Sequence, residues 1–370
     1  MIINICLPVW GDLFRDQFLR FVLPSHLAKG NLPYLSDRCQ VRYYIYSTRY
    51  DINLMMDHPA IAALAGMTEI VFMPIRVVPE ATTPLNNDNS ALLPKYGTMV
   101  ECYCDMLGKV AGDPDQLICL WTGDILLTED CCRHWLDYIL AGKRAVLSHG
   151  ISIISETAEW ELRQYQDSSG TISVPPRDMV ALMLKHLHPF SAAQCWNGDA
   201  VTKCLSMLYW KVENEGLISR AFHTGPMMAR GCRKDGSPVR LRKTTTPDIH
   251  FVDDNYPDCE ELVIQTDSDE GFVVEMCSIY YERQHPNPSQ QWTVEYAVGI
   301  LFSWYMSGFF PDLDLHLFMA SHMVCYHQGK NGPAWEAMEA QSKTDFNTIL
   351  DVTKQLMNER ARMLQTLTEA

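Results

Sequence analysis

Short apolar runs alternate with amphipathic stretches over the first 150 residues, which is the pattern of a sheet covered by helices. Apolar runs rich in β-branched and aromatic residues predict strands at 2–9, 41–47, 69–73, 116–121 and 145–148, of which 2–9 and 116–121 are expected to be buried. Apolar side chains at helical spacing predict helices at 14–27, 58–65, 95–111 and 132–140. This half of the chain therefore predicts an α/β fold.

The regular pattern weakens after residue 155. A break that contains Ser, Gly and Pro at 167–176 and a basic loop at 230–243 precede an uncharged apolar run at 296–310. Those fifteen residues are too few for a comfortable membrane span, so we expect a buried helix, with a membrane-facing helix as the alternative. The second part of the chain, 156–335, is expected to be less regular than the first, 1–155.

The last part of the chain, 336–370, carries an apolar stripe from Phe346 to Leu367, which predicts an amphipathic helix. Ser342 and Asp345 have the spacing of a capping box, and this predicts that the helix opens at Ser342. The stripe must be covered, either by the same chain or by a second copy. A homodimer is the expected outcome.

Composition and charge exclude several classes of protein. The 370 residues are 47% hydrophobic and 20% charged, which is typical of a globular chain. A net charge of −15 argues against binding to nucleic acid or to an anionic membrane surface. The thirteen cysteines include no CxxC pair, and the N-terminus reaches Pro8 without a basic stretch, so neither a zinc ribbon nor a signal peptide is expected. Because the cysteines do not form a secreted disulfide pattern and no signal peptide is expected, we expect a protein of the reducing cytoplasm, without a transmembrane segment.

The short motifs of several common enzyme classes are absent from the sequence. It contains no GxGxxG after the first strand, no GxxxxGK[ST], no HExxH and no GxSxG. The most informative position is instead Asp124, which follows the buried run 116–121. Ligands bind at the carboxyl ends of strands in open α/β sheets, and a carboxylate there can hold Mg²⁺ or Mn²⁺ against a diphosphate. A simple turn or helix cap is the alternative role for Asp124.

The order of predicted elements up to Asp124 resembles the nucleotide-sugar half of GT-A type glycosyltransferases, in which a DxD motif falls at this point. Thr122 stands where that motif has its first Asp. Over most of residues 1–275, further segments look like the landmarks of a group of uncharacterised bacterial glycosyltransferase-like proteins: Val9-Trp10-Gly11-Asp12, 23–33, 44–48, Lys95-Tyr96, 141–146 and 220–223.

The resemblance implies a GT-A-like, Rossmann-like sheet with helices on both faces, and transfer of a sugar from a nucleotide diphosphate sugar to a glycan, lipid-linked or protein hydroxyl. It implies the following donor-binding residues: Val9, Trp10, Gly11, Thr48, Lys95, Tyr96, Thr122, Gly123 and Asp124. Asp124 and His223 would hold Mn²⁺ or Mg²⁺. Asp253 or Asp254 would act as the general base of an inverting reaction.

Two other functions stay open at this stage. Because Thr122 leaves the acidic motif incomplete, the chain could be a non-catalytic relative that binds a nucleotide or a glycan. The third possible function is a structural scaffold that assembles through the terminal helix. Asp267 and Asp269 form a second acidic pair after an apolar run. We expect this pair to cap the next element, with a metal or acceptor site as the alternative.

Overall fold

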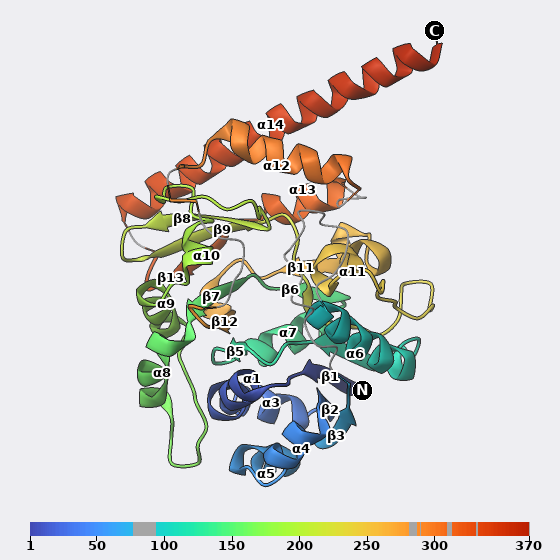
Figure 1. Ribbon diagram of the computed structural model, residues 1–370, viewed down its shortest axis with the longest axis vertical. Helices are drawn as coiled ribbons and strands as arrows, with labels where there is room; N and C mark the ends of the chain where they lie inside the picture. Colours follow the sequence, from blue (N-terminus) through green and yellow to red (C-terminus); the bar gives the residue numbers. More distant parts are fainter. Residues whose placement is uncertain (77–93, 281–286, 289, 309–312, 331, 370) are drawn as a thin grey trace.

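The computed structural model in Figure 1 describes residues 1–370 except 77–93, 281–286, 289, 309–312, 331 and 370. Its centre is a mixed α/β layer: a seven-stranded sheet with the order β11-β6-β10-β4-β1-β2-β3, against which helices pack. The strands are β1 (Ile2–Pro8), β2 (Gln40–Ser47), β3 (Glu69–Pro74), β4 (Gln116–Leu120), β6 (Ala145–Leu147), β10 (Pro226–Arg230) and β11 (Leu262–Ile264).

The strands of the seven-stranded sheet run parallel except β10, which is antiparallel to both β4 and β6. Six of the seven residues of β1 are buried, as continuous apolar runs in a parallel sheet require. The five strands expected from the apolar runs are confirmed. β10 and β11 come from the second part of the chain and complete the sheet that the first part begins.

The helices expected in the first part are confirmed, with the first one divided by a π-helical turn, η1, just before Pro24. Two further short helices, α3 (Leu32–Ser36) and α4 (Arg49–Met55), were not predicted from the sequence. The elements are α1 (Asp12–Gln17), η1 (Phe18–Val22), α2 (Leu23–His26), α3 (Leu32–Ser36), α4 (Arg49–Met55), α5 (Pro59–Ala65), α6 (Pro94–Val110) and α7 (Cys131–Leu140).

Two three-stranded sheets lie beside the central one, in the orders β5-β12-β7 and β13-β9-β8. Their strands are β5 (Ile125–Leu127), β7 (Gly150–Ile154), β8 (Met207–Val212), β9 (Gly216–Ala221), β12 (Val273–Cys277) and β13 (Val324–His327). The remaining helices are α8 (Ser155–Leu162), η2 (Arg163–Tyr165), α9 (Pro176–Lys185), α10 (Pro189–Ala192), α11 (Pro247–Asn255), η3 (Cys259–Glu261), η4 (Ser268–Glu270), α12 (Val294–Met306), α13 (Leu313–Ser321) and α14 (Pro333–Glu369).

The apolar run 296–310 forms most of α12, which buries Ala297, Val298 and Leu301 and packs on α14. The helix is confirmed, but only one of its faces is buried, and residues 309 and 310 lie outside the described residues. Within the described ranges, no helix has both the length and the apolar character that crossing a membrane requires.

The terminal helix begins nine residues earlier than the capping-box pattern predicts. Pro333 follows Gly332, whose φ is +118°, and proline is favoured in the first turn of a helix. Ser342 is buried inside α14 and its hydroxyl donates to the carbonyl of Glu339. The Asp345 carboxylate accepts a hydrogen bond of 2.9 Å from the Trp210 indole. The predicted cap was therefore wrong, because Ser342 and Asp345 make tertiary and intrahelical contacts instead.

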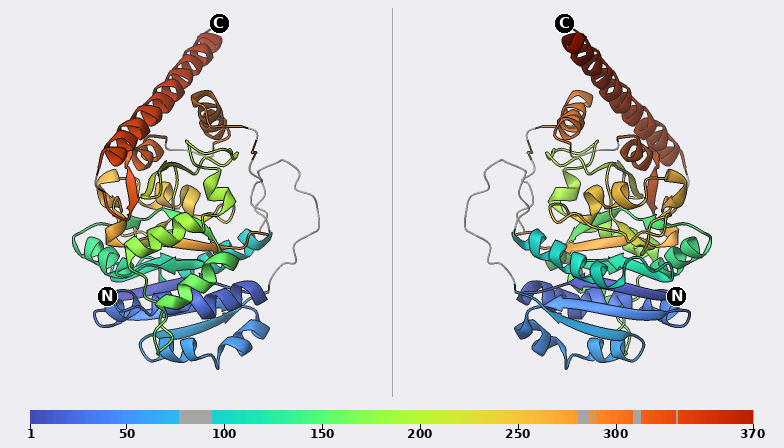
Figure 2. Two further views of the ribbon diagram at one scale, coloured as in Figure 1. Left: turned by 90° about the vertical axis from the view of Figure 1, so that its left-hand side faces the viewer. Right: turned by 90° about the vertical axis from the view of Figure 1, so that its right-hand side faces the viewer.

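The first half of α14 docks on its own chain, whereas the helix then projects from the body (Figure 2). Phe346 and Ile349 are buried in a second apolar cluster with Phe222, while Leu356 and Met363 are 37% and 65% exposed. Deleting residues 342–370 should therefore lower the free energy of unfolding by at least about 3 kcal/mol, since losing one buried Phe costs this much. Urea denaturation measures the loss.

A shorter deletion, 357–370, is the matched control and should change the unfolding free energy by less than about 0.5 kcal/mol, because it removes no buried side chain among the described residues. Equal stability of both truncations would contradict the docking of α14. Light scattering measures the mass of the same proteins and so tests the expected homodimer. If wild type is a dimer and the 357–370 deletion is a monomer, the contact between the two copies lies on the projecting end of α14.

Candidate functional site at the carboxyl edge of the central sheet

The topology brings most of the candidate residues to one edge of the central sheet. The six parallel strands end at this edge, and the antiparallel β10 begins there. The chain builds outward from β1 through β2 to β3 and then returns to place β4 on the other side of β1. This reversal between β1 and β4 is a topological switch point, the place where open α/β sheets bind ligands.

The loop after β1 is held by a buried carboxylate that the sequence did not single out. The Asp51 Oδ2 atom accepts hydrogen bonds from the Gly11 amide at 3.1 Å and the Thr48 hydroxyl at 2.7 Å. Its Oδ1 atom accepts from the Arg15 guanidinium at 2.8 Å. Asp51 thus connects the end of β1 to the end of β2. The spacing Thr48-x-x-Asp51 is a helix-capping pattern, and the Thr48 hydroxyl accepts a hydrogen bond from the Asp51 amide. This pattern in the sequence could therefore have identified Asp51.

The end of β4 lies directly against the loop after β1. A Cβ atom on Gly123 would lie 2.7 Å from the Val9 Cγ2 atom, so only glycine permits this approach. The Thr122 hydroxyl donates to the Asp124 Oδ1 atom at 2.5 Å, and both side chains are half-buried. The neighbouring Trp10 is also half-buried. The structure therefore brings together the donor residues predicted after β1 and after β4.

Lys95 and Tyr96 lie in the first turn of α6, half-buried, with the Lys95 Nζ atom 5.1 Å from the centre of the Tyr96 ring. The far end of α6 at Val110 leads within a few residues into the start of β4. Seventeen helical residues span about 25 Å. The first turn of α6 therefore lies toward the carboxyl edge, where Asp124 also lies.

His223 precedes β10, the strand next to β4. β10 runs antiparallel to β4 and begins at the carboxyl edge of the sheet, so His223 lies at the same edge as Asp124. The His223 Nδ1 atom lies 3.5 Å from an oxygen of Asp248, at the start of α11. Burial raises the pKa of the Tyr103 hydroxyl, and nearby negative charges, including Asp124 and Asp248, raise it further. Asp124 and Asp248 thus both affect the pKa of Tyr103. Asp248, which lies next to His223, was not singled out from the sequence.

Asp253 and Asp254 point to different partners. The Asp254 carboxylate forms two hydrogen bonds of 2.6 Å with Arg242. Asp253 is buried, with one oxygen 3.1 Å from the His316 Nε2 atom and 3.9 Å from His250. Burial alone would raise the pKa of Asp253, but the interactions with His250 and His316 hold it below its ordinary value. Neither carboxylate is without a partner, and their different surroundings make their roles separable by mutation.

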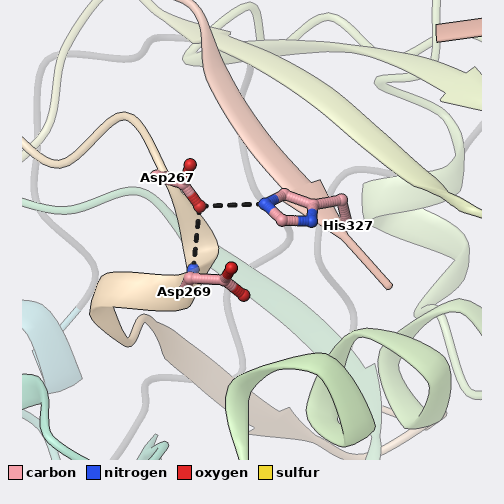
Figure 3. A group of neighbouring side chains, drawn as sticks. All are labelled: Asp267, Asp269 and His327. Atoms are coloured by element: carbon pink, nitrogen blue, oxygen red, sulfur yellow. Dashed lines mark hydrogen bonds and ion pairs between the residues drawn. The ribbon is translucent and has the colours of Figure 1, made fainter. Parts of the chain in front are cut away.

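Figure 3 shows a group that could hold a metal ion: Asp267, Asp269 and His327, whose candidate ligand atoms lie within 4.8 Å of one another. Asp267 follows β11, and its carboxylate accepts from the Asp269 amide at 2.9 Å. The expected capping role of Asp267 is confirmed. The His327 Nε2 atom lies 2.9 Å from the same Asp267 oxygen.

The charges of this group are already compensated by two cations. Lys330 contacts the other oxygen of Asp267 at 2.6 Å, and Arg177 binds both oxygens of Asp269, at 3.0 and 2.8 Å. Burial would raise the pKa of Asp267, but Lys330 and the other donors lower it to about 2. A metal ion would have to displace these partners. The contacts favour a structural tie between η4, β13 and α9 over a metal site.

Replacing Asp267 and Asp269 with Asn should therefore lower the free energy of unfolding by about 1 to 3 kcal/mol, since a cap and a hydrogen bond to a buried histidine are lost. Nucleotide affinity of the folded variant should stay within a few-fold. Asp258→Asn is a suitable control because Asp258 also caps a short helix, η3, and also pairs with a lysine, Lys234. Loss of Mn²⁺-dependent stabilisation at an unchanged melting temperature would instead make the group a metal site.

Comparisons with known proteins do not assign the chain to a family. No family model matches it, and no curated protein matches it. Among solved structures, the apo form of mouse xyloside xylosyltransferase 1 is similar with a TM-score of 0.25 and 10% sequence identity. The match covers 44% of this chain and 58% of the xylosyltransferase chain. At this level, the likeness establishes neither a shared family nor a shared activity.

Proposed function

We propose that the protein is a glycosyltransferase that moves a sugar from a nucleotide diphosphate sugar to a hydroxyl of a glycan, a lipid-linked saccharide or a protein. The main support is the switch point between β1 and β4, where Gly123 packs on Val9 and leaves Asp124 at the edge. A half-buried carboxylate at that point suits the ribose or a cation bound with the diphosphate.

The chain's own groups would act on the donor by position and charge. Lys95, in the first turn of α6, would approach the phosphates, because ammonium groups and helix amino termini favour anions. The loop Val9 to Gly11 and Thr48, tied together through Asp51, would face the base and ribose. Such positioning lowers the barrier by stabilising the departing diphosphate and aligning the acceptor.

A divalent cation would neutralise the diphosphate. Mg²⁺ is commonly held by one or two carboxylates together with phosphate oxygens, so Asp124 suits that role, and His223, at the same edge of the sheet, would be a second ligand. Among the described residues, however, Asp124 does not belong to any group of three close ligand atoms. The cation would therefore be retained only together with the donor. Asp254, whose side chain is 24% exposed, is the more accessible of the two proposed bases, whereas Asp253 is 5% exposed.

A non-catalytic nucleotide- or glycan-binding protein is the second candidate function. It is favoured by Thr122, which supplies a hydroxyl where a second carboxylate would strengthen cation binding, and whose hydroxyl bonds to Asp124. Such a protein would bind donor without breaking its glycosidic bond.

Thermal denaturation with UDP, GDP, CDP and their sugars, with and without Mn²⁺, tests nucleotide binding, because selective binding raises the melting temperature. Release of free nucleoside diphosphate from a stabilising donor then separates the two functions. Donor cleavage supports the transferase, stabilisation without cleavage supports the binding protein, and no stabilisation by any nucleotide would overturn both.

A further inference from the structure

A hollow of about 590 Å³ lies where β2 and β3 end, and it is lined by Arg49, Pro74, Ile75 and Arg76. The Ile75 amide donates to the Ser47 carbonyl at 2.8 Å, which extends the pairing of the two strands to the lining itself. The volume lies within the range of small-molecule sites. The hollow is therefore built on the ends of two paired strands of the central sheet.

The two arginines give this hollow a local positive charge on a chain whose net charge is −15. Both are exposed, and in the part of the chain that the structure describes neither has an ion-pair partner. Asp51, only two positions after Arg49, has its carboxylate engaged by Gly11, Thr48 and Arg15. The two guanidinium groups thus remain available to a ligand.

Their chemistry identifies the kind of ligand. A guanidinium presents paired N–H donors that match the oxygens of a phosphate or carboxylate. The apolar lining from Pro74 and Ile75 suits the uncharged part of a small molecule next to that anion.

We infer that Arg49 and Arg76 form a binding site for an oxyanion, a phosphate or carboxylate carried by a small ligand. Neighbouring strands are about 5 Å apart, so β2 and β3 lie about 10 and 15 Å from β4 along the sheet. The hollow is therefore offset from Asp124 along the sheet edge, and it lies next to Thr48, which the proposed function places at the base and ribose. The oxyanion belongs either to a nucleotide or to a second, acidic substrate. The binding site does not require that the protein is a transferase.

Calorimetric titration tests the inference with four probes: inorganic pyrophosphate, UDP, glucose 1-phosphate and glucuronate. The double variant Arg49→Gln with Arg76→Gln should bind at least one of the probes at least 10-fold more weakly than wild type. Arg38→Gln is the matched control, because Arg38 is exposed and precedes the same strand β2 at the opposite edge of the sheet. The control should bind every probe within 2-fold of wild type.

The four probes also identify the source of the oxyanion. Weaker binding of UDP and pyrophosphate assigns it to a nucleotide, whereas weaker binding of glucose 1-phosphate or glucuronate alone assigns it to an acidic second substrate. If the double variant unfolds, the two single variants Arg49→Gln and Arg76→Gln replace it. A second double variant, Arg49→Lys with Arg76→Lys, keeps both positive charges and should retain part of the wild-type affinity. Wild-type affinity in the glutamine variants, or no binding of any probe to wild type, would overturn the site. Because turnover is not measured, a failure of the proposed transferase leaves this result unaffected.

Discussion

Replacing Asp124 with Asn should reduce donor turnover by about 100-fold or more and leave the melting temperature nearly unchanged. The substitution keeps the size of the side chain and an oxygen that can accept from the Thr122 hydroxyl, but it removes the negative charge. If that charge holds the cation that neutralises the departing diphosphate, its loss costs about 3 kcal/mol of transition-state stabilisation. Steady-state turnover of UDP- and GDP-sugars at fixed Mn²⁺ measures the effect.

Thr122→Ala provides the matched control for this experiment. It removes the hydrogen bond to Asp124 but leaves the carboxylate, so turnover should fall by no more than about 10-fold, as expected for one hydrogen bond. A different pattern would identify Asp124 as a turn residue: about 1 kcal/mol of lost stability in Asp124→Asn with unchanged nucleotide affinity. Equal rates and affinities in wild type and Asp124→Asn would refute the proposed site.

Replacing Asp253 with Ala should lower the free energy of unfolding by about 3 to 5 kcal/mol, because it leaves a buried histidine without its charged partner. Both nitrogens of the fully buried His316 contact oxygen atoms: the Phe222 carbonyl at 2.7 Å and Asp253 at 3.1 Å. Removing the Asp253 carboxylate takes away one of these two oxygen contacts inside the protein, where a lost hydrogen bond is costly. Urea denaturation at neutral pH measures the loss.

Asp254→Ala is the control on the adjacent residue and should cost less than about 1 kcal/mol, because its partner Arg242 is 46% exposed and solvent screens the pair. The pH dependence gives a second check. Since the folded state lowers the pKa of Asp253, its contribution is present above the unfolded pKa of about 3.9 and is lost as the pH falls through the lowered value. The difference between wild type and Asp253→Ala should shrink on acidification. Equal effects of the two substitutions at neutral pH would contradict the buried pair.

The sequence by itself determined the local elements of the first part of the chain and the position of Asp124. Strands β1, β2 and β4 consist mostly of apolar and aromatic residues, and α6 and α7 carry apolar side chains at helical spacing. Such patterns specify local backbone conformation and the face that is buried. Because the carboxyl ends of parallel strands share one edge, the sequence was also sufficient to place Asp124 at that edge, while its association with the loop that contains Gly11 rested on the resemblance to GT-A type glycosyltransferases.

Only the tertiary structure decided which distant residues meet. β10 enters the sheet antiparallel to β4, and this long-range pairing brings His223 to the edge that carries Asp124. The same holds for Asp51, which joins Gly11 to Thr48, and for Arg49 and Arg76, which share a hollow only because β2 and β3 end together. The sequence pattern around Ser342 predicted a cap, but a proline nine residues earlier and contacts with the body of the protein set the start of α14. Spacing along a chain constrains neighbours within a few residues, whereas contacts between residues far apart in sequence depend on strand order and packing across the whole fold.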